Sequence, residues 1–112
     1  MTPSDPASAL SRYRLKFVPD ALAEWETLDG SIKNILRKLL KKRLEQPHVP
    51  GSRLRGDLHN CYKIKLKKQG YRLVYTAEDG EMVVLVLVVD KREDFAAYHA
   101  AIERILAGKL VS

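Results

Sequence analysis

Lysine and arginine side chains are concentrated in one short segment of the chain. Residues 53–72 hold seven bases and one acid, Asp57; the bases are Arg53, Arg55, Lys63, Lys65, Lys67, Lys68 and Arg72. The whole chain has 20 bases and 14 acids, so the remaining residues carry thirteen of each and balance. A surplus placed this way favours a polyanionic partner, most simply nucleic acid. A solvated basic surface that maintains solubility is the alternative.

The order of residues in this segment predicts how the cations face one another. Within residues 60–67 apolar side chains alternate with lysines, and residues 70–76 place Tyr71, Leu73 and Tyr75 on one side and Arg72 and Val74 on the other, which favours two strands. If a two-residue turn joins them as a hairpin, Lys65 lies opposite Arg72, and Lys63 lies on the same face. Like charges at opposed positions destabilise a sheet, which favours an anion such as a phosphate between them. A longer, bulged turn would shift this pairing by one residue.

Such a cluster of cations suits phosphate chemistry. Neighbouring positive charges disfavour the protonated form of a lysine, which makes Lys63 or Lys65 a candidate general base, for example on a ribose 2′-hydroxyl. An arginine beside it can stabilise the charge that develops on the phosphate. The alternative is a passive face that binds phosphate without cleaving it.

Other reactive side chains predict less. His48, His59 and His99 have neither metal-ligand spacing nor a paired carboxylate, so we expect no metal and no cofactor. The single cysteine, Cys61, favours a reducing compartment and is predicted to be a buried structural thiol. No stretch approaches about 18 apolar residues, and residues 1–6 lack a signal-peptide pattern. We therefore expect a cytoplasmic protein that does not contact a membrane.

The elements that position these residues form one α+β domain. The 112 residues suffice for one domain, and the predicted order is β-α-α-β-β-β-α. We expect an antiparallel four-stranded sheet packed with a helical hairpin and a C-terminal helix. The domain is predicted to span residues 12–107, between a flexible tail over 1–11 and a short tail over 108–112.

Periodicity sets the predicted bounds of these elements. The strands are expected at 11–18, 60–67, 70–76 and 82–89, and the helices at 19–29, 31–46 and 93–107. In the first strand, Leu15 is expected on the same side as Tyr13 and Phe17, and in the first helix Leu22 is expected in the apolar stripe. Ser31 is the expected cap of the second helix. The almost wholly apolar last strand is predicted to be buried on both faces.

Several segments of the chain together resemble the RelE family of bacterial toxins. The resemblance covers roughly residues 12–107 and rests on Ala23-Glu24-Trp25, Leu54-Arg55-Gly56, Cys61-Tyr62-Lys63-Ile64-Lys65-Leu66, Gly70-Tyr71-Arg72-Leu73-Val74-Tyr75 and Asp90-Lys91-Arg92-Glu93. It implies a toxin that cleaves messenger RNA in the ribosomal A site and that a RelB-like antitoxin neutralises. It also implies that promoter DNA is bound only through the complex with the antitoxin.

The resemblance implies a set of site residues. These are Lys63, Lys65, Arg72, Arg92 and Tyr98, with Arg55 as a further contact to RNA. In this reading Lys65 is the base, and Arg92 assists the leaving oxygen. Lys63 and Arg72 hold the phosphate, and Tyr98 orients or stacks on a nucleotide. Spacing alone leaves Tyr98 equally open to a core position and makes Arg92 an ordinary charged residue between a strand and a helix.

Three functions remain in competition at this point. The first is a metal-independent endoribonuclease working by attack of the 2′-hydroxyl on the adjacent phosphate, with the ribosome supplying the positioning that a site without a strong acid–base pair lacks. The second is a ParE-like toxin of the same fold that poisons DNA gyrase. The third is a non-catalytic RNA-binding module.

Overall fold

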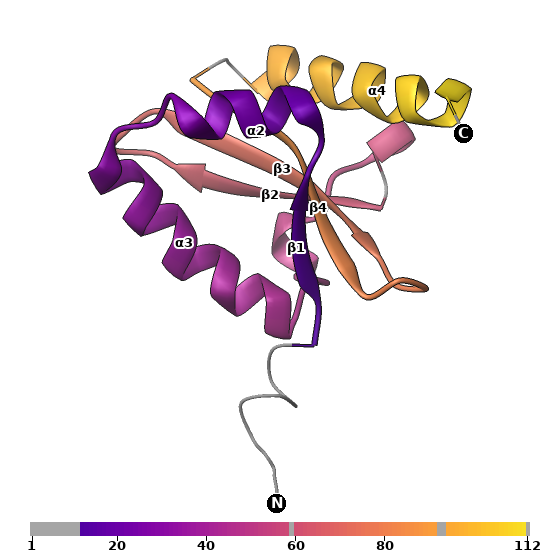
Figure 1. Ribbon diagram of the computed structural model, residues 1–112, viewed down its shortest axis with the longest axis horizontal. Coiled ribbons are helices and arrows are strands. Elements are labelled where there is room, and N and C mark those ends of the chain that lie inside the picture. Colours follow the sequence, from indigo (N-terminus) through magenta and orange to yellow (C-terminus); the bar gives the residue numbers. More distant parts are fainter. Residues whose placement is uncertain (1–11, 59, 92–93, 112) are drawn as a thin grey trace, which may run out of the picture.

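The computed structural model describes residues 12–58, 60–91 and 94–111. Its strands are β1 (Arg14–Phe17), β2 (Cys61–Leu66), β3 (Tyr71–Glu78) and β4 (Val83–Asp90), and its helices are α2 (Pro19–Glu26), α3 (Gly30–Glu45) and α4 (Asp94–Val111). Two short 3-10 turns, η1 (Pro50–Ser52) and η2 (Gly56–Leu58), lie between α3 and β2. The element order and the α+β class are as predicted (Figure 1). None of the described helices combines the length and apolar character that crossing a membrane requires.

The four strands form one sheet in the order β1-β4-β3-β2. The β2–β3 and β3–β4 pairs are antiparallel, as expected for strands joined by short turns. β1 pairs with β4 in parallel, so the prediction of a wholly antiparallel sheet was wrong. Turn residues dictate direction only between strands adjacent in sequence, whereas β1 and β4 are separated by both helices and two strands.

Two apolar cores lie on opposite faces of this sheet. α2 and α3 cover one face, where Trp25 and Leu36 pack with Tyr62 and Ile64. α4 covers the other face, where its small residues Ala97, Ala100 and Ala101 pack with residues such as Val74 and Val88. β4 contributes to both cores and is almost entirely buried, which confirms the prediction for the last strand.

Two leucines predicted to be buried are exposed. The residue exposure is 37% for Leu15 and 42% for Leu22. Leu15 belongs to a four-residue strand at the edge of the sheet, where cover is incomplete. α2 packs through Ala21 and Trp25, followed by Leu28, at i, i+4 and i+7. That helical face turns Leu22 outward.

The ends of two helices also differ from the prediction. Asp29, not Ser31, caps α3: its carboxylate accepts from the Ser31 backbone N–H at 3.5 Å and the Ser31 hydroxyl at 2.8 Å. These bonds hold the pKa of Asp29 below its ordinary value. α4 ends at Val111, four residues beyond the predicted end of the helix at residue 107. The predicted tail over residues 1–11 lies outside the described residues.

The turn between β2 and β3 is longer than predicted, yet the pairing is the one expected. Leu66 pairs with Tyr71, which leaves a four-residue turn over 67–70. Gly70 has a φ of +76°, which favours glycine, and its N–H donates to the Leu66 carbonyl at 2.8 Å. The turn gains one residue on each side, so Lys65 still lies opposite Arg72.

Candidate nucleic-acid interface

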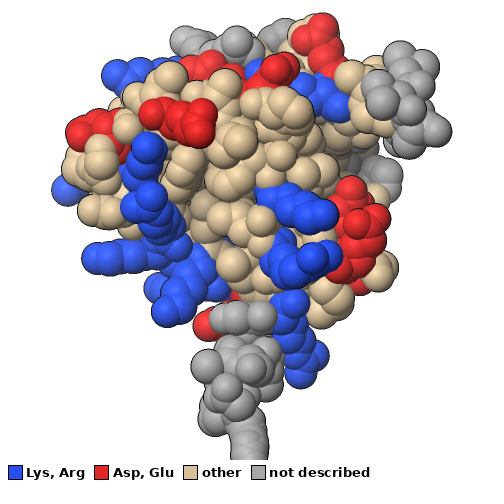
Figure 2. Space-filling model, viewed as in Figure 1, with Lys and Arg blue, Asp and Glu red and all other residues tan. Residues whose placement is uncertain are grey.

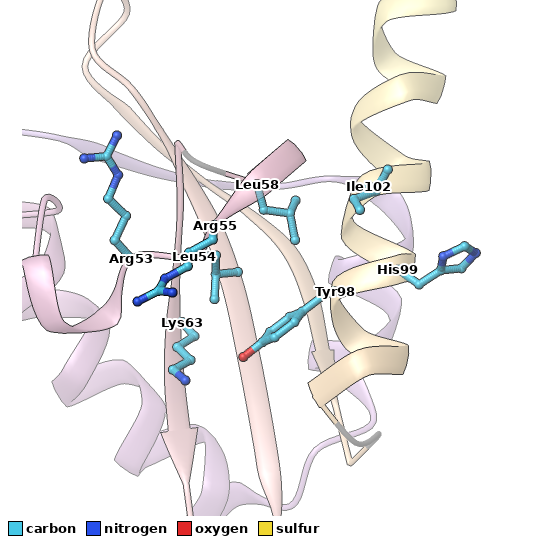
Figure 3. Close-up of a pocket in the computed structure, with 8 residues that line it drawn as sticks. All are labelled: Arg53, Leu54, Arg55, Leu58, Lys63, Tyr98, His99 and Ile102. Carbon is cyan, nitrogen blue, oxygen red and sulfur yellow. The ribbon is translucent and has the colours of Figure 1, made fainter.

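A cleft opens where α4 ends its cover of the sheet. α4 packs mainly against β4 and β3, and beside it lies the edge strand β2. The cleft has a volume of about 610 Å³, and it is lined by Arg53, Leu54, Arg55, Leu58, Lys63, Tyr98, His99 and Ile102 (Figure 3). It therefore combines apolar residues with a rim of cations and the phenol ring of Tyr98, which suits a nucleotide better than a purely apolar ligand.

The predicted cations stand on the α4 face of the sheet. Lys63 and Lys65 alternate with the buried residues of β2. Lys65 is exposed, whereas Lys63 and Arg72 are half-buried. The carbonyls of Cys61 and Lys63 bond outward, to groups beyond the sheet edge. Backbone groups of alternate residues in a strand point the same way, so those of Lys65 also point away from β3. The Lys65–Arg72 pair is therefore a non-hydrogen-bonded pair, in which the side chains of opposed residues come closest.

Asp90 extends this row of charges and was missed from the sequence. Arg72 pairs with Lys65 on one side and with Asp90 on the other, so cation, cation and anion follow one another across three strands. A carboxylate beside Arg72 offsets part of the repulsion between the two cations. The acid was visible in the motif that begins at Asp90, but no local signal reveals its register with Arg72.

Tyr98 reaches the same cleft from the opposite wall. It lies on α4 between the buried residues Ala97 and Ala101, and its own side chain is half-buried. The ring packs against the apolar core, and its hydroxyl points across the cleft toward Lys63 (Figure 3). The two interpretations of this tyrosine are thus compatible, because one side of the ring packs while the other faces the cleft.

The loop before β2 supplies two further cations to the cleft. Arg53 and Arg55 are both exposed and line it, anchored by the buried Leu54 between them. Arg55 was singled out from the sequence, while Arg53 and His99 were not. The sequence placed Arg53 in the basic segment and His99 next to Tyr98, but neither position by itself indicates a residue of the cleft. Arg92 lies outside the described residues.

Two titratable side chains outside the cleft, Cys61 and His48, have structural surroundings. Cys61 is 1% exposed, and burial raises the pKa of its thiol to about 11, which confirms the predicted structural thiol. His48 bonds through Nδ1 to the Tyr62 hydroxyl and through Nε2 to Asp79, both at 2.7 Å, at the α3 face of the sheet rather than in the cleft. Within the described ranges, no three His, Cys, Asp or Glu side chains gather as potential metal ligands.

Comparison with known proteins agrees with the fold. Residues 15–95 match the family model of the ParE toxin of the type II toxin–antitoxin system, parDE. The mRNA interferase toxin RelE of Escherichia coli K12 is 45% identical over 94 residues, covering 84% of this chain and 98% of the relative.

Solved structures extend the likeness to the backbone. A mutant of E. coli toxin RelE in the free state gives a TM-score of 0.77 at 42% identity, over 84% of this chain and 98% of that chain. The toxin in the intact E. coli RelBE toxin–antitoxin complex gives 0.69 at 44% identity, over 72% and 98%. This chain therefore belongs to the RelE/ParE superfamily of type II toxin–antitoxin toxins, and within it to the RelE family.

Proposed function

We propose that this protein is the toxin of a type II toxin–antitoxin module and cleaves messenger RNA in the ribosomal A site without a metal. Two observations support this function most directly: Lys63 and Tyr98 line one cleft, and Lys65, on the same face of β2 as Lys63, lies opposite Arg72 in the β2–β3 pair. The name of the E. coli K12 relative, an mRNA interferase, supports it independently. The ParE-like alternative has less support, because these residues match the nuclease set residue by residue.

The reaction that fits the cleft is attack of a ribose 2′-oxygen on the adjacent phosphorus. The bond to the 5′-oxygen breaks, which yields a 2′,3′-cyclic phosphate and a free 5′-hydroxyl. Lys65 accepts the 2′-hydroxyl proton, and Lys63 and Arg72 hold the non-bridging oxygens as their charge increases. Arg92 assists the leaving oxygen.

Tyr98 gives the cleft a means of holding a nucleotide. Its half-buried ring presents one face to the cleft, where a base can stack. Arg55, at the rim, adds a contact to the RNA backbone. The ring thus orients the ribose, while the cations fix the phosphate.

The ribosome supplies the remaining positioning. The catalytic set has no strong acid–base pair, so cleavage of free RNA is expected to be slow. Holding the reacting groups in line is worth several kcal/mol in comparable reactions, on the order of 7–11 at best. We therefore place the reaction in the cytoplasm, on translating ribosomes.

A RelB-like antitoxin completes the module. An E. coli relative has been solved in a complex of toxin and antitoxin. The antitoxin either lies across the basic face or displaces α4, whose buried residues at its contact with the sheet are, in the described part of the helix, the small Ala97, Ala100 and Ala101. Small side chains bury little apolar area, so a competing helix can replace this contact. Promoter DNA is bound only through the antitoxin complex.

Mapping of mRNA 5′ ends in a reconstituted translation reaction tests this function. Native protein should produce cuts inside the A-site codon, and both the doubly substituted Lys65→Ala/Arg92→Ala protein and a reaction without ribosomes should produce none. Lys38→Ala, which removes an exposed cation from α3, is the matched control and should cut normally. Intact mRNA with native protein would overturn the proposal and lead to a gyrase-supercoiling assay. RNA binding without any cut would indicate the binding module.

A further inference from the structure

Arg43 differs from the other cations of α3 in where its side chain lies. Lys41 and Lys42 are exposed, whereas Arg43, in the last turn of the helix, is half-buried. Its guanidinium lies over the Tyr75 ring, with Cζ 5.7 Å from the ring centroid. A cation drawn inward in this way loses hydration, so its position has to be explained by the partners it gains.

The partners of Arg43 come from three separate elements. Nη1 donates to the Lys63 carbonyl at 3.3 Å and to the Tyr75 hydroxyl at 2.9 Å, and Nη2 donates to Ser52 Oγ at 3.2 Å. The Tyr75 hydroxyl donates in turn to the Pro47 carbonyl at 2.7 Å, so its oxygen is free to accept from Arg43. The planar fork of a guanidinium can serve all three acceptors at once, which a lysine cannot.

These hydrogen bonds hold two backbone segments that contribute residues to the cleft. The outward carbonyl of Cys61, on the edge strand β2, accepts from the Leu54 N–H at 2.9 Å. Two residues further along the same edge, the carbonyl of Lys63 accepts from Arg43. Ser52 directly precedes Arg53 in the loop that forms the other basic part of the cleft. One guanidinium therefore ties the strand that carries Lys63 to the loop that carries the rim arginines.

We propose that Arg43 is a positioning residue of the cleavage site: it fixes the backbone of Lys63 at the edge of β2, and through it the direction of the Lys63 side chain. Arg43 itself touches neither the RNA nor the reacting atoms. The inference rests on the proposed function, because its readout is the rate of mRNA cleavage. Small displacements of a group that holds the phosphate slow a reaction strongly, so we expect the loss of Arg43 to lower kcat about tenfold.

Kinetics at varied ribosome concentration separate positioning from binding. Arg43→Ala should lower kcat about tenfold, while the ribosome concentration that gives half-maximal rate changes less than about twofold. Lys38→Ala removes an equal charge from the exposed side of the same helix and should leave kcat at the native value. If Arg43→Ala retained the native kcat, the inference would be overturned. The proposed function would still stand in that case, because the native protein cleaves mRNA. No cleavage by the native protein would refute the proposed function itself.

A double-mutant cycle with Lys63 distinguishes positioning from a general loss of folded protein. If Arg43 acts through Lys63, then adding Arg43→Ala to Lys63→Ala should cost less than about twofold in rate. If Arg43 only stabilised the fold, its loss would lower the folded fraction equally in the native and the Lys63→Ala backgrounds. The rate would then fall about tenfold in each background, and that result would overturn the inference.

Should Arg43→Ala fail to fold, Ser52→Ala removes one acceptor of the same guanidinium. It should lower kcat about two- to threefold in the native background and hardly at all beside Lys63→Ala.

Discussion

The two faces of strand β2 serve different ends. Tyr62, Ile64 and Leu66 face α3 and are 4%, 3% and 7% exposed, whereas Lys63 and Lys65 face the side where α4 leaves the sheet uncovered. The period of two along a strand makes this division possible, since neighbouring residues point to opposite faces. One face of the strand thus contributes to the apolar core, and the other presents basic side chains on the side of the sheet where the cleft lies.

A second comparison concerns the cations themselves. Figure 2 shows basic side chains along the outer surface of α3 and of β1 as well, where Lys38, Lys41, Arg14 and Lys16 are exposed. Those residues are not among the residues that line the cleft. The cations of the cleft instead surround a hollow that also contains an aromatic ring and apolar residues. The surroundings, not the charge, distinguish a candidate site from a solvated surface.

The largest expected effect comes from substituting one residue on each face of β2 and comparing the two variants. Lys65→Ala should lower ribosome-dependent cleavage about 100-fold or more and change the free energy of unfolding by less than about 0.5 kcal/mol. Ile64→Ala should destabilise the protein by about 2–5 kcal/mol and leave the cleavage rate per folded molecule near native. Urea unfolding followed by circular dichroism and quantified cleavage measure both. If the two variants lost stability and activity in parallel, the division between the faces would be refuted.

A smaller effect tests how α4 is held to its face. Arg104 of α4 contacts Glu24 of α2 at 3.0 Å and donates to the Leu87 carbonyl, while Glu24 accepts from the Val89 N–H at 3.0 Å. The Glu24 carboxylate, through its hydrogen bond first, raises the pKa of Arg104 further. The two side chains are 16% and 19% exposed. Glu24→Leu leaves the guanidinium without this partner and should destabilise the protein by about 1–3 kcal/mol.

The matched control for this ion pair is the double variant. Glu24→Leu/Arg104→Leu removes both charges and should recover part of the stability lost by Glu24→Leu alone. The loss in the single variant should also be nearly independent of salt, because the pair is mostly buried. Urea unfolding at low and high salt measures both properties. An additive double variant would show that the pair does not hold α4 to α2.

The smallest expected effect lies on the α3 side and depends on pH. Asp79 accepts from the Tyr13 hydroxyl and contacts His48 Nε2, both at 2.7 Å, and these bonds, that from Tyr13 first, lower its pKa from the ordinary 3.8. A lowered pKa in the folded state contributes stability that is present above the unfolded value and is lost as the pH falls through the folded value. The free energy of unfolding should therefore decline below about pH 4, and less so in Asp79→Asn. Equal acid dependence in the two proteins would contradict this.

Patterns that repeat over a few residues were readable from the chain alone. Alternation in residues 60–67 and 70–76 predicted both strands and the Lys65–Arg72 pair, because side-chain direction in a strand follows from position. Apolar periodicity predicted α3, and the burial of β4 on both faces followed from its composition. The motifs carried the family resemblance and, with it, Lys63 and Tyr98, which the structure brings to one cleft.

Only the tertiary structure decided the rest, and in each case the missing information joins residues far apart in sequence. The parallel pairing of β1 with β4 and the place of Asp90 beside Arg72 depend on strand registers that no single segment encodes. Arg43 shares a basic helix with exposed lysines, and its inward direction depends on Lys63, Tyr75 and Ser52. Local periodicity determines which face of an element is apolar. Which partners meet that face is determined by packing of the whole chain.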